Sequence, residues 1–138
     1  MNDQKTCSWP GCTYERMDNQ VYCIFHAKNK DSVEFWTKLY EELSKIEGDK
    51  LHLEGFIFPE GDDSIKSEVF SLFENKIVNL NKARFNTVLQ LSGINIKKIL
   101  IDNAIFHKDV VLENIEVDEL SMNNSSIKSF NIKKAICN

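Results

Sequence analysis

From Val78 onward the sequence repeats an apolar pattern every five residues, a period that neither an α-helix nor a single β-strand produces. The stretch INIKKILIDNAIFHKD (residues 94–109) shows the pattern, because apolar triplets alternate there with polar pairs. The central apolar residues of successive units are Leu80, Phe85, Leu91, Ile96, Ile101, Phe106, Leu112, Val117, Met122, Ile127, Ile132 and Cys137. Nine of the eleven steps between them are five residues long, and two are six. A short fixed period predicts a solenoid, in which each unit buries its apolar side only against stacked neighbours.

The other positions of each unit predict a backbone that turns at a corner. The residue two places before each central residue is also apolar. The one exception is Ser125, which stands two places before Ile127. A pair without an apolar member, such as Lys97-Lys98 or Asp102-Asn103, follows each of the first eleven central residues. Two inward residues and a polar corner in every five fit a coil that turns after each unit.

The N-terminal segment CSWPGCTYERMDNQVYCIFH has the spacing of a zinc knuckle. Its candidate ligands are Cys7, Cys12, Cys23 and His26, in the pattern C-x4-C-x10-C-x2-H. Zinc takes four tetrahedral thiolate or imidazole ligands, often as two close pairs. Gly11 can supply the positive φ of a turn just before Cys12. Four protein ligands would close the site, so we expect the zinc to be structural; a disulfide pair or free structural thiols are the alternative.

One helix is predicted over residues 31–48. Asp31 with Glu34 three residues later resembles a capping box, and Gly48 fits the end of the helix. The apolar residues at helical spacing are Val33, Trp36, Leu39, Tyr40, Leu43 and Ile46. We expect this stripe to pack inside the protein, and a partner-binding face is the alternative. The connector 49–77 reads as extended at first, and its second part, residues 63–77, is either irregular or a short helix.

The repeats resemble those of the pentapeptide-repeat family. The segments YCIFH and EGFIFPEG, on either side of an acidic helix, are also similar to the knuckle-led members of that family. The resemblance implies a mainly β fold, a right-handed quadrilateral β-helix of about twenty residues per coil, preceded by the zinc knuckle and one α-helix. The chain departs from the family where bulky Ile, Leu, Val or Phe replaces the usual small Ala. The implied organisation is a zinc knuckle (1–30), an amphipathic helix (31–48), a connector with a first irregular coil (49–77) and the β-helix (78–138).

Such a coil brings residues about twenty positions apart onto adjacent rungs. Lys97-Lys98 would then lie near Asp118-Glu119, and Glu113 near Lys133. Asp102-Asn103 would lie near Asn123-Asn124. The lysine pairs are therefore interpreted as inter-rung charge matching, with a nucleic-acid patch as the alternative.

Composition points to a folded cytoplasmic protein. The chain has 138 residues, of which 42% are hydrophobic and 28% charged, values typical of a globular domain. The N-terminus MNDQKTCSWPGC has no apolar core of a signal peptide, and no run approaches the length of a membrane span. A cytoplasmic protein keeps its thiols reduced, which favours metal binding over disulfides.

Acidic residues are concentrated in the middle of the chain. Residues 31–74 carry twelve Asp or Glu against four Lys, a balance of −8, whereas residues 78–138 carry eight Lys or Arg against six Asp or Glu, a balance of +2. We interpret the acidic segment as a surface for a basic protein partner. The candidate contact residues are Glu41, Glu42, Glu60, Asp62 and Asp63.

The sequence contains no recognisable catalytic constellation, so we expect no enzyme but a protein-interaction or inhibitor module on a zinc-stabilised scaffold. One alternative is a DNA-mimic inhibitor of a DNA-processing enzyme, which the family resemblance suggests; the net positive charge of 78–138 weakens it. Another is nucleic-acid binding through the knuckle, where Lys5, Arg16, Lys28 and Lys30 are basic. The final coil has no visible cap, so we expect either a homodimer through the C-terminal coil or further chain after Asn138.

Overall fold

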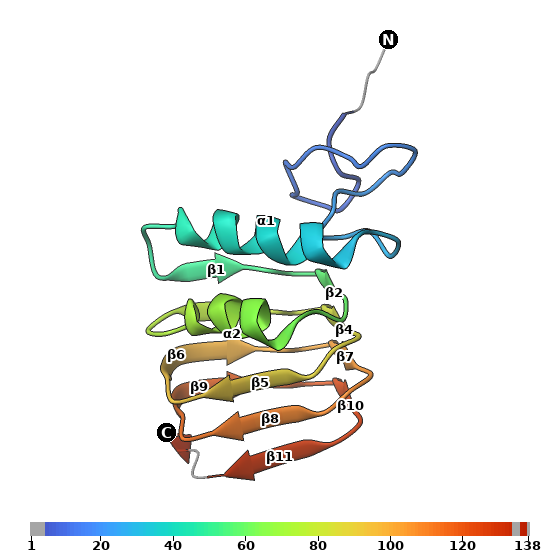
Figure 1. The fold of residues 1–138 in the computed structure, drawn as a ribbon. Coiled ribbons are helices and arrows are strands. Elements are labelled where there is room, and N and C mark those ends of the chain that lie inside the picture. The colour runs from blue at the N-terminus through green and yellow to red at the C-terminus, as the bar shows by residue number, and fades with distance from the viewer. Residues whose placement is uncertain (1–4, 134–135, 138) are drawn as a thin grey trace.

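The protein is mainly β, with parallel sheets and two helices among the described residues (Figure 1). The computed structural model describes residues 5–133, 136 and 137. The N-terminal segment lies at one end of the molecule with α1 beside it, the sheets extend to the other end, and α2 lies on one side of the stack, next to β5. The helices are α1 (Ser32–Ser44) and α2 (Asp63–Ser71). Within the described residues, neither helix is long and apolar enough to cross a membrane.

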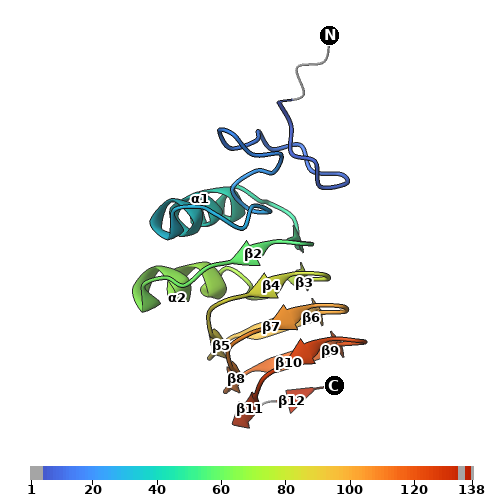
Figure 2. The ribbon, with the colours of Figure 1, turned by 90° about the vertical axis from the view of Figure 1, so that its right-hand side faces the viewer.

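Three sheets carry the described strands, and every pair of these strands is parallel. The five-stranded sheet contains β1 (Lys50–His52), β3 (Ile77–Asn79), β6 (Asn95–Leu100), β9 (Glu116–Ser121) and β12 (Ile136–Cys137). The four-stranded sheet contains β2 (Ile57–Phe58), β4 (Arg84–Phe85), β7 (Ile105–Phe106) and β10 (Ser126–Ile127). The three-stranded sheet contains β5 (Leu89–Ser92), β8 (Val110–Glu113) and β11 (Phe130–Lys133). The chain visits the sheets in turn, as the view in Figure 2 also shows.

The strand registers follow from the five-residue period. Val78 pairs with Ile99, and Leu112 pairs with Ile132. The second pair is separated by four units of five, whereas the first pair is one position further apart because its round contains one of the six-residue steps. The extra residue is thus absorbed within a round, and the next strand still pairs in phase.

The first round is longer because it contains α2. Lys50 pairs with Ile77, and Ile57 with Arg84, so this round spans more of the chain than the later ones do. Asp62 caps the helix by accepting a hydrogen bond from the N–H of Ser64 at 2.8 Å. The sequence predicted one helix, and the structure has two. The second helix, α2, lies within residues 63–77, which the sequence analysis described as either irregular or a short helix.

The buried face of α1 differs from the predicted stripe. Its buried residues are Phe35, Trp36, Leu39 and Leu43. Val33 is 72% exposed, and Tyr40 is also exposed. The sequence prediction was wrong for Val33 and Tyr40. Phe35, next to Trp36, is buried, so the buried face of α1 that packs on the sheets is rotated toward Phe35. Ile46 lies beyond the last turn of the helix.

A stack of phenylalanine rings forms the centre of the sheet core. The Phe58 and Phe85 rings lie 4.2 Å apart and nearly parallel, and the Phe85 and Phe106 rings lie 4.7 Å apart. All three side chains are buried. Burial decreases toward the last strands, where Met122 and Ile132 are exposed.

Several of the predicted contacts between polar corners are present, although Lys97 forms its ion pair with Asp49, at 3.1 Å. Lys98 forms an ion pair with Glu119 at 2.8 Å, and the Asp102 carboxylate accepts a hydrogen bond from the N–H of Asn123 at 2.7 Å. Glu113 and Lys133 are partners in the register of β8 and β11. These pairings confirm the sequence-based expectation that residues about one round apart are neighbours.

One corner repeats a left-handed backbone conformation in three successive rounds. Lys82, Asn103 and Asn124 have φ values of 64°, 58° and 57°, and they recur at equal intervals along the chain. Asparagine tolerates this region well, whereas lysine does so at a cost. At this corner the polar pair after each apolar unit therefore serves two purposes. It adopts the left-handed backbone of the turn, and it faces solvent.

Candidate metal centre

Three cysteines and a histidine meet in the N-terminal segment. The four candidate ligand atoms, from Cys7, Cys12, Cys23 and His26, all lie within 4.8 Å of one another. The His26 Nδ1 atom is 3.4 Å from the Sγ atoms of both Cys7 and Cys23. The Cys12 and Cys23 Sγ atoms are 3.8 Å apart, and the three cysteines are free thiols rather than disulfide partners. This cluster could hold a metal ion.

Tight backbone turns bring each pair of candidate ligands together. The N–H of Cys12 donates to the Trp9 carbonyl at 3.0 Å, which closes the loop between the first two cysteines. Gly11 within that loop has a φ of 83°. The N–H of His26 donates to the Cys23 carbonyl at 3.2 Å, so the second pair shares a single turn.

The imidazole of His26 is oriented as a metal ligand requires. Its Nε2 atom lies 2.9 Å from the carbonyl oxygen of Glu54, which can only accept, so Nε2 carries the proton and donates. The Nδ1 lone pair is then free to face the three thiols. A backbone carbonyl on the second nitrogen fixes the tautomer in this way at many metal sites.

Aromatic rings fix the plane of the same imidazole. The Trp9 ring stacks on His26 with centroids 4.9 Å apart and an interplanar angle of 7°. Phe56 packs against the imidazole edge-on, at 5.2 Å. The candidate ligand is therefore held on two sides as well as through its hydrogen bond.

Burial disfavours thiolates in this cluster unless a cation is present. It raises the pKa of the Cys23 thiol to about 12 and also raises the pKa of Cys12. Burial lowers the pKa of His26, which keeps the imidazole neutral and able to coordinate. A bound cation would offset the cost of ionising the thiols, since metal ligation deprotonates cysteine.

Lys30 joins the candidate metal centre to the sheets. Its Nζ atom donates to the carbonyls of Ile24 at 2.7 Å and Ile57 at 2.6 Å, and it lies 4.4 Å from the centroid of the Phe35 ring. Burial lowers the pKa of this amine to about 7. The amine also lies 3.4 Å from the carbonyl of Phe25, so three backbone carbonyls surround it.

The approach of Trp9 to the sheets requires a glycine. Gly55 has a φ of 71°, and a Cβ at this position would overlap the Trp9 ring. Sequence reasoning did not identify Trp9, Lys30, Glu54 or Gly55 as supports of the cluster. The position of Trp9 between the first two cysteines was one signal; the sequence offers none for Lys30.

In comparisons with known proteins, no family model matches the chain, and no curated protein or solved structure is significantly similar to it. The ligand atoms and their supports must therefore carry the functional argument.

The five acidic residues predicted to bind a partner are placed in two groups. Glu41 and Glu42 lie on α1, while Glu60, Asp62 and Asp63 lie where the chain enters α2. Three of the acids form ion pairs at 3.7–3.9 Å: Glu42–Lys45, Asp63–Lys66 and Glu60–Lys108. Asp62 is the cap of α2. Stabilising roles thus account for part of the acidic pattern.

Proposed function

We propose that this chain is a non-enzymatic protein-interaction module of the pentapeptide-repeat type, whose N-terminal knuckle holds a structural zinc ion. The observation that carries the structural-metal part of this proposal is the convergence of four protein ligand atoms within 4.8 Å of one another. A tetrahedral ion bound by all four would have no open position for water or substrate. Such a site stabilises a fold and does not activate a reactant.

Zinc fits the donor set best. Three thiolates and an imidazole form one of the common structural zinc sets, and soft sulfur ligands disfavour Mg²⁺ and Ca²⁺. Protein purified without added metal should contain one zinc per chain, and the Cys12→Ser variant should lose it. The neighbouring exposed substitution Thr13→Ser should keep the full metal content. A wild-type chain without zinc, or Cys12→Ser with a full complement, would contradict the assignment.

Three observations support a right-handed quadrilateral β-helix as the scaffold. All described strands pair in parallel, neighbouring strands are offset by one round, and each of the later rounds contains four units of the repeat. A crystal structure would test the proposal directly. A handedness or number of sides other than those proposed would overturn it.

The interaction role rests on the exposed acidic surface near the helices. Glu41 is exposed on α1, and Asp63 is exposed at the start of α2. A protein captured by the full chain from a lysate, and retained after nuclease treatment, would agree with the proposal. Capture that disappears with nuclease would favour nucleic-acid binding through the knuckle instead. The free thiols of the cluster also favour a reducing compartment such as the cytoplasm.

We further propose a homodimer that covers the last described strands. β10 and β11 are the outermost strands of their sheets, and Ile132 on β11 is 54% exposed. Pairing of two copies would satisfy strand edges and bury this side chain. Sedimentation should show a dimer that the Ile132→Asp variant weakens, with Asn131→Asp as the control for added charge. A monomer at high protein concentration would contradict this arrangement.

A further inference from the structure

Two thiols of the candidate metal centre are in contact, and one of them is accessible. The Sγ atoms of Cys12 and Cys23 lie 3.8 Å apart. Cys12 is half-buried between the exposed Gly11 and Thr13, whereas Cys23 is 1% exposed. We propose that Cys12 and Cys23 form a reversible disulfide when the protein meets a peroxide, and that the metal ion leaves the cluster as this bond forms. The inference rests on the structural zinc proposed above and adds a regulation of the same site.

Exposure singles out Cys12 as the thiol that a peroxide reaches first. The thiolate character and the exposure of a sulfur atom decide which cysteine an oxidant modifies. A bound metal ion holds all three cysteine ligands as thiolates, so exposure is what distinguishes them. Cys7 and Cys23 are 6% and 1% exposed, and Cys12 is the most accessible of the three. The first attack on the peroxide therefore comes from Cys12.

The Cys23 thiol is placed to complete the reaction. The sulfur atoms of a disulfide lie about 2.05 Å apart, so this pair must approach by less than about 2 Å. Gly11 precedes Cys12 directly, and a Cβ added to it would meet no atom within 4 Å, so the loop has room to move. The Cys7 Sγ atom is held differently, because it accepts a hydrogen bond from the N–H of Trp9 at 3.5 Å. The geometry thus favours a bond between Cys12 and Cys23.

The reaction uses one molecule of peroxide for each disulfide. The Cys12 thiolate attacks one oxygen of hydrogen peroxide, the O–O bond breaks, and the products are a sulfenic acid and hydroxide. The Cys23 thiolate then attacks the Cys12 sulfur, an S–S bond forms, the S–O bond breaks, and a second hydroxide leaves. Solvent protons convert both hydroxides to water. The two sulfur atoms together lose two electrons, and the peroxide gains them.

The disulfide leaves too few ligands to hold the metal ion. Structural zinc takes four protein donors, and only Cys7 and His26 would remain. The join to the sheets does not depend on these ligands alone, because the N–H of Ile57 donates to the carbonyl of Phe25 at 2.8 Å. Oxidation should therefore loosen residues 5–22 and leave the attachment of Phe25 intact.

The experiment treats the full chain with a small molar excess of hydrogen peroxide and measures the released zinc with a coloured chelator. The Cys137→Ser background leaves the three cysteines of the cluster as the only thiols of the chain. Peptide mapping by mass spectrometry without reduction then identifies the disulfide. Two further variants are compared in this background. Cys12→His replaces the accessible thiol by another zinc ligand, and Cys7→His makes the same exchange at a buried thiol.

We expect the Cys137→Ser protein to release one zinc per chain and to contain a disulfide between Cys12 and Cys23. Dithiothreitol with added zinc should restore the original state. Release from Cys12→His should be slower by about tenfold or more, whereas Cys7→His should stay close to the Cys137→Ser protein. Zinc retained under peroxide, or a disulfide that includes Cys7, would overturn the proposal. If Cys12→His holds no zinc, the disulfide mapped in the Cys137→Ser protein decides the matter.

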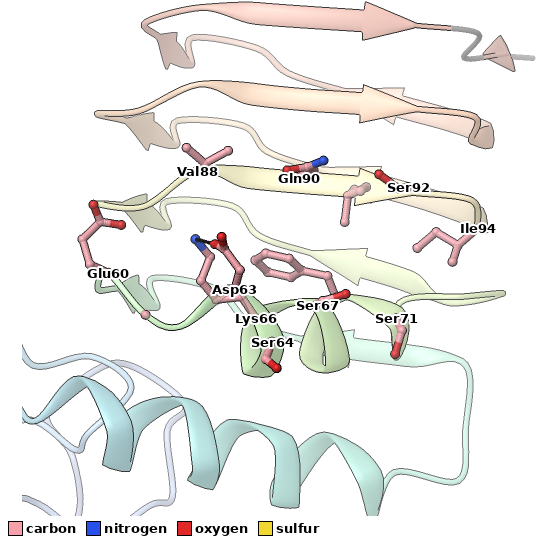
Figure 3. A pocket seen from close by; sticks show the side chains of 13 residues that line it. Glu60, Asp63, Ser64, Lys66, Ser67, Ser71, Val88, Gln90, Ser92 and Ile94 are labelled. Carbon is pink, nitrogen blue, oxygen red and sulfur yellow. Dashed lines mark ion pairs between the residues drawn. The ribbon is translucent and has the colours of Figure 1, made fainter.

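The cavity between α2 and β5 supplies an internal reference in the same samples (Figure 3). Lys66 forms an ion pair with Asp63 at 3.8 Å in its wall, and none of the described residues that line it is a cysteine or histidine. Amide exchange at Ser67 and Leu91 should be the same before and after peroxide, while exchange in residues 5–22 becomes faster. Equal acceleration in both places would show general unfolding by the oxidant and would overturn the proposal.

The zinc content before oxidation separates this inference from the metal proposal. A chain that carries no zinc at the start contradicts the structural zinc site and, with it, the release of zinc by peroxide. A chain that carries one zinc and keeps it under peroxide contradicts only this inference. Neither measurement involves a partner, so the interaction function is tested independently by capture.

Discussion

Residues 5–30 and residues 50–133 bury their central side chains by different means. The first region has a single isolated β-bridge, between Thr6 and Glu15, yet Cys23 is 1% exposed. The second is built from repeated strands, and Phe85 at its centre is fully buried. The first region is too short to stabilise a core of its own, whereas a repeated unit gains a new buried layer with every round. Residues 5–30 therefore rely on a cluster of candidate metal ligands, and residues 50–133 rely on repetition.

Metal removal should have the largest effect and should be confined to one region. A chelator that strips the ion is expected to remove on the order of 10 kcal/mol of stabilisation from residues 5–30, because four ligands lose their common partner. Limited proteolysis should then cut this region while strands β3 to β9 stay protected. Equal cleavage of both regions would show that the sheets depend on the metal too. Chelator followed by excess zinc is the control.

Loss of one stacked ring should destabilise the sheets instead. Phe85→Ala removes a ring that lies between Phe58 and Phe106, and we expect a loss of about 3–5 kcal/mol in the free energy of unfolding. Urea unfolding followed by circular dichroism measures it. The Phe85→Leu variant, which keeps most of the volume, should lose less. Metal content should remain that of wild type, and its loss would contradict the separation of the two regions.

Gly55→Ala tests the junction between the regions. The added methyl group would overlap Trp9 and would impose a positive φ on alanine, so we expect a cost of about 1–3 kcal/mol. The effect should appear as faster amide exchange at His26 and Phe56 on either side of the junction. Gly48→Ala, where a Cβ would meet no atom within 4 Å, is the matched control. Equal stability of the two variants would mean that neither the overlap with Trp9 nor the positive φ at residue 55 costs stability.

Lys82→Gly should have the smallest effect, and it should be stabilising. Lysine at a φ of 64° carries backbone strain that glycine avoids, so a gain of about 1 kcal/mol is expected. The control Lys128→Gly, which has no positive φ, should destabilise the chain because glycine gains freedom when unfolded. Thermal unfolding compares the two. A loss at both positions would show that the corner conformation stores no strain.

The sequence predicted the features that spacing or repetition specifies. The register between neighbouring strands follows from counting four units per round, and Lys98 meets Glu119 as that count requires. The candidate ligands were found because their spacing matches metal-binding pairs. The repeat occurs many times in the sequence, and the four candidate ligands fall within one short segment.

The features that sequence reasoning missed depend on single contacts between distant segments. The bonds of Lys30 to Ile57 and of His26 to Glu54 join distant parts of the chain without any repeat. The buried face of α1 was predicted wrongly for the same reason, because packing against the sheets buries Phe35 and leaves Val33 exposed.

The pairing of each strand with the strand one round away has a consequence for folding speed. Parallel sheets ordinarily pair strands that are distant in sequence, and the search for those contacts slows folding. Here every described strand finds its partner in an adjacent round, so each step closes only a short loop. Folding can therefore advance round by round from the phenylalanine stack, and faster than in a β protein whose strand partners lie further apart in the sequence.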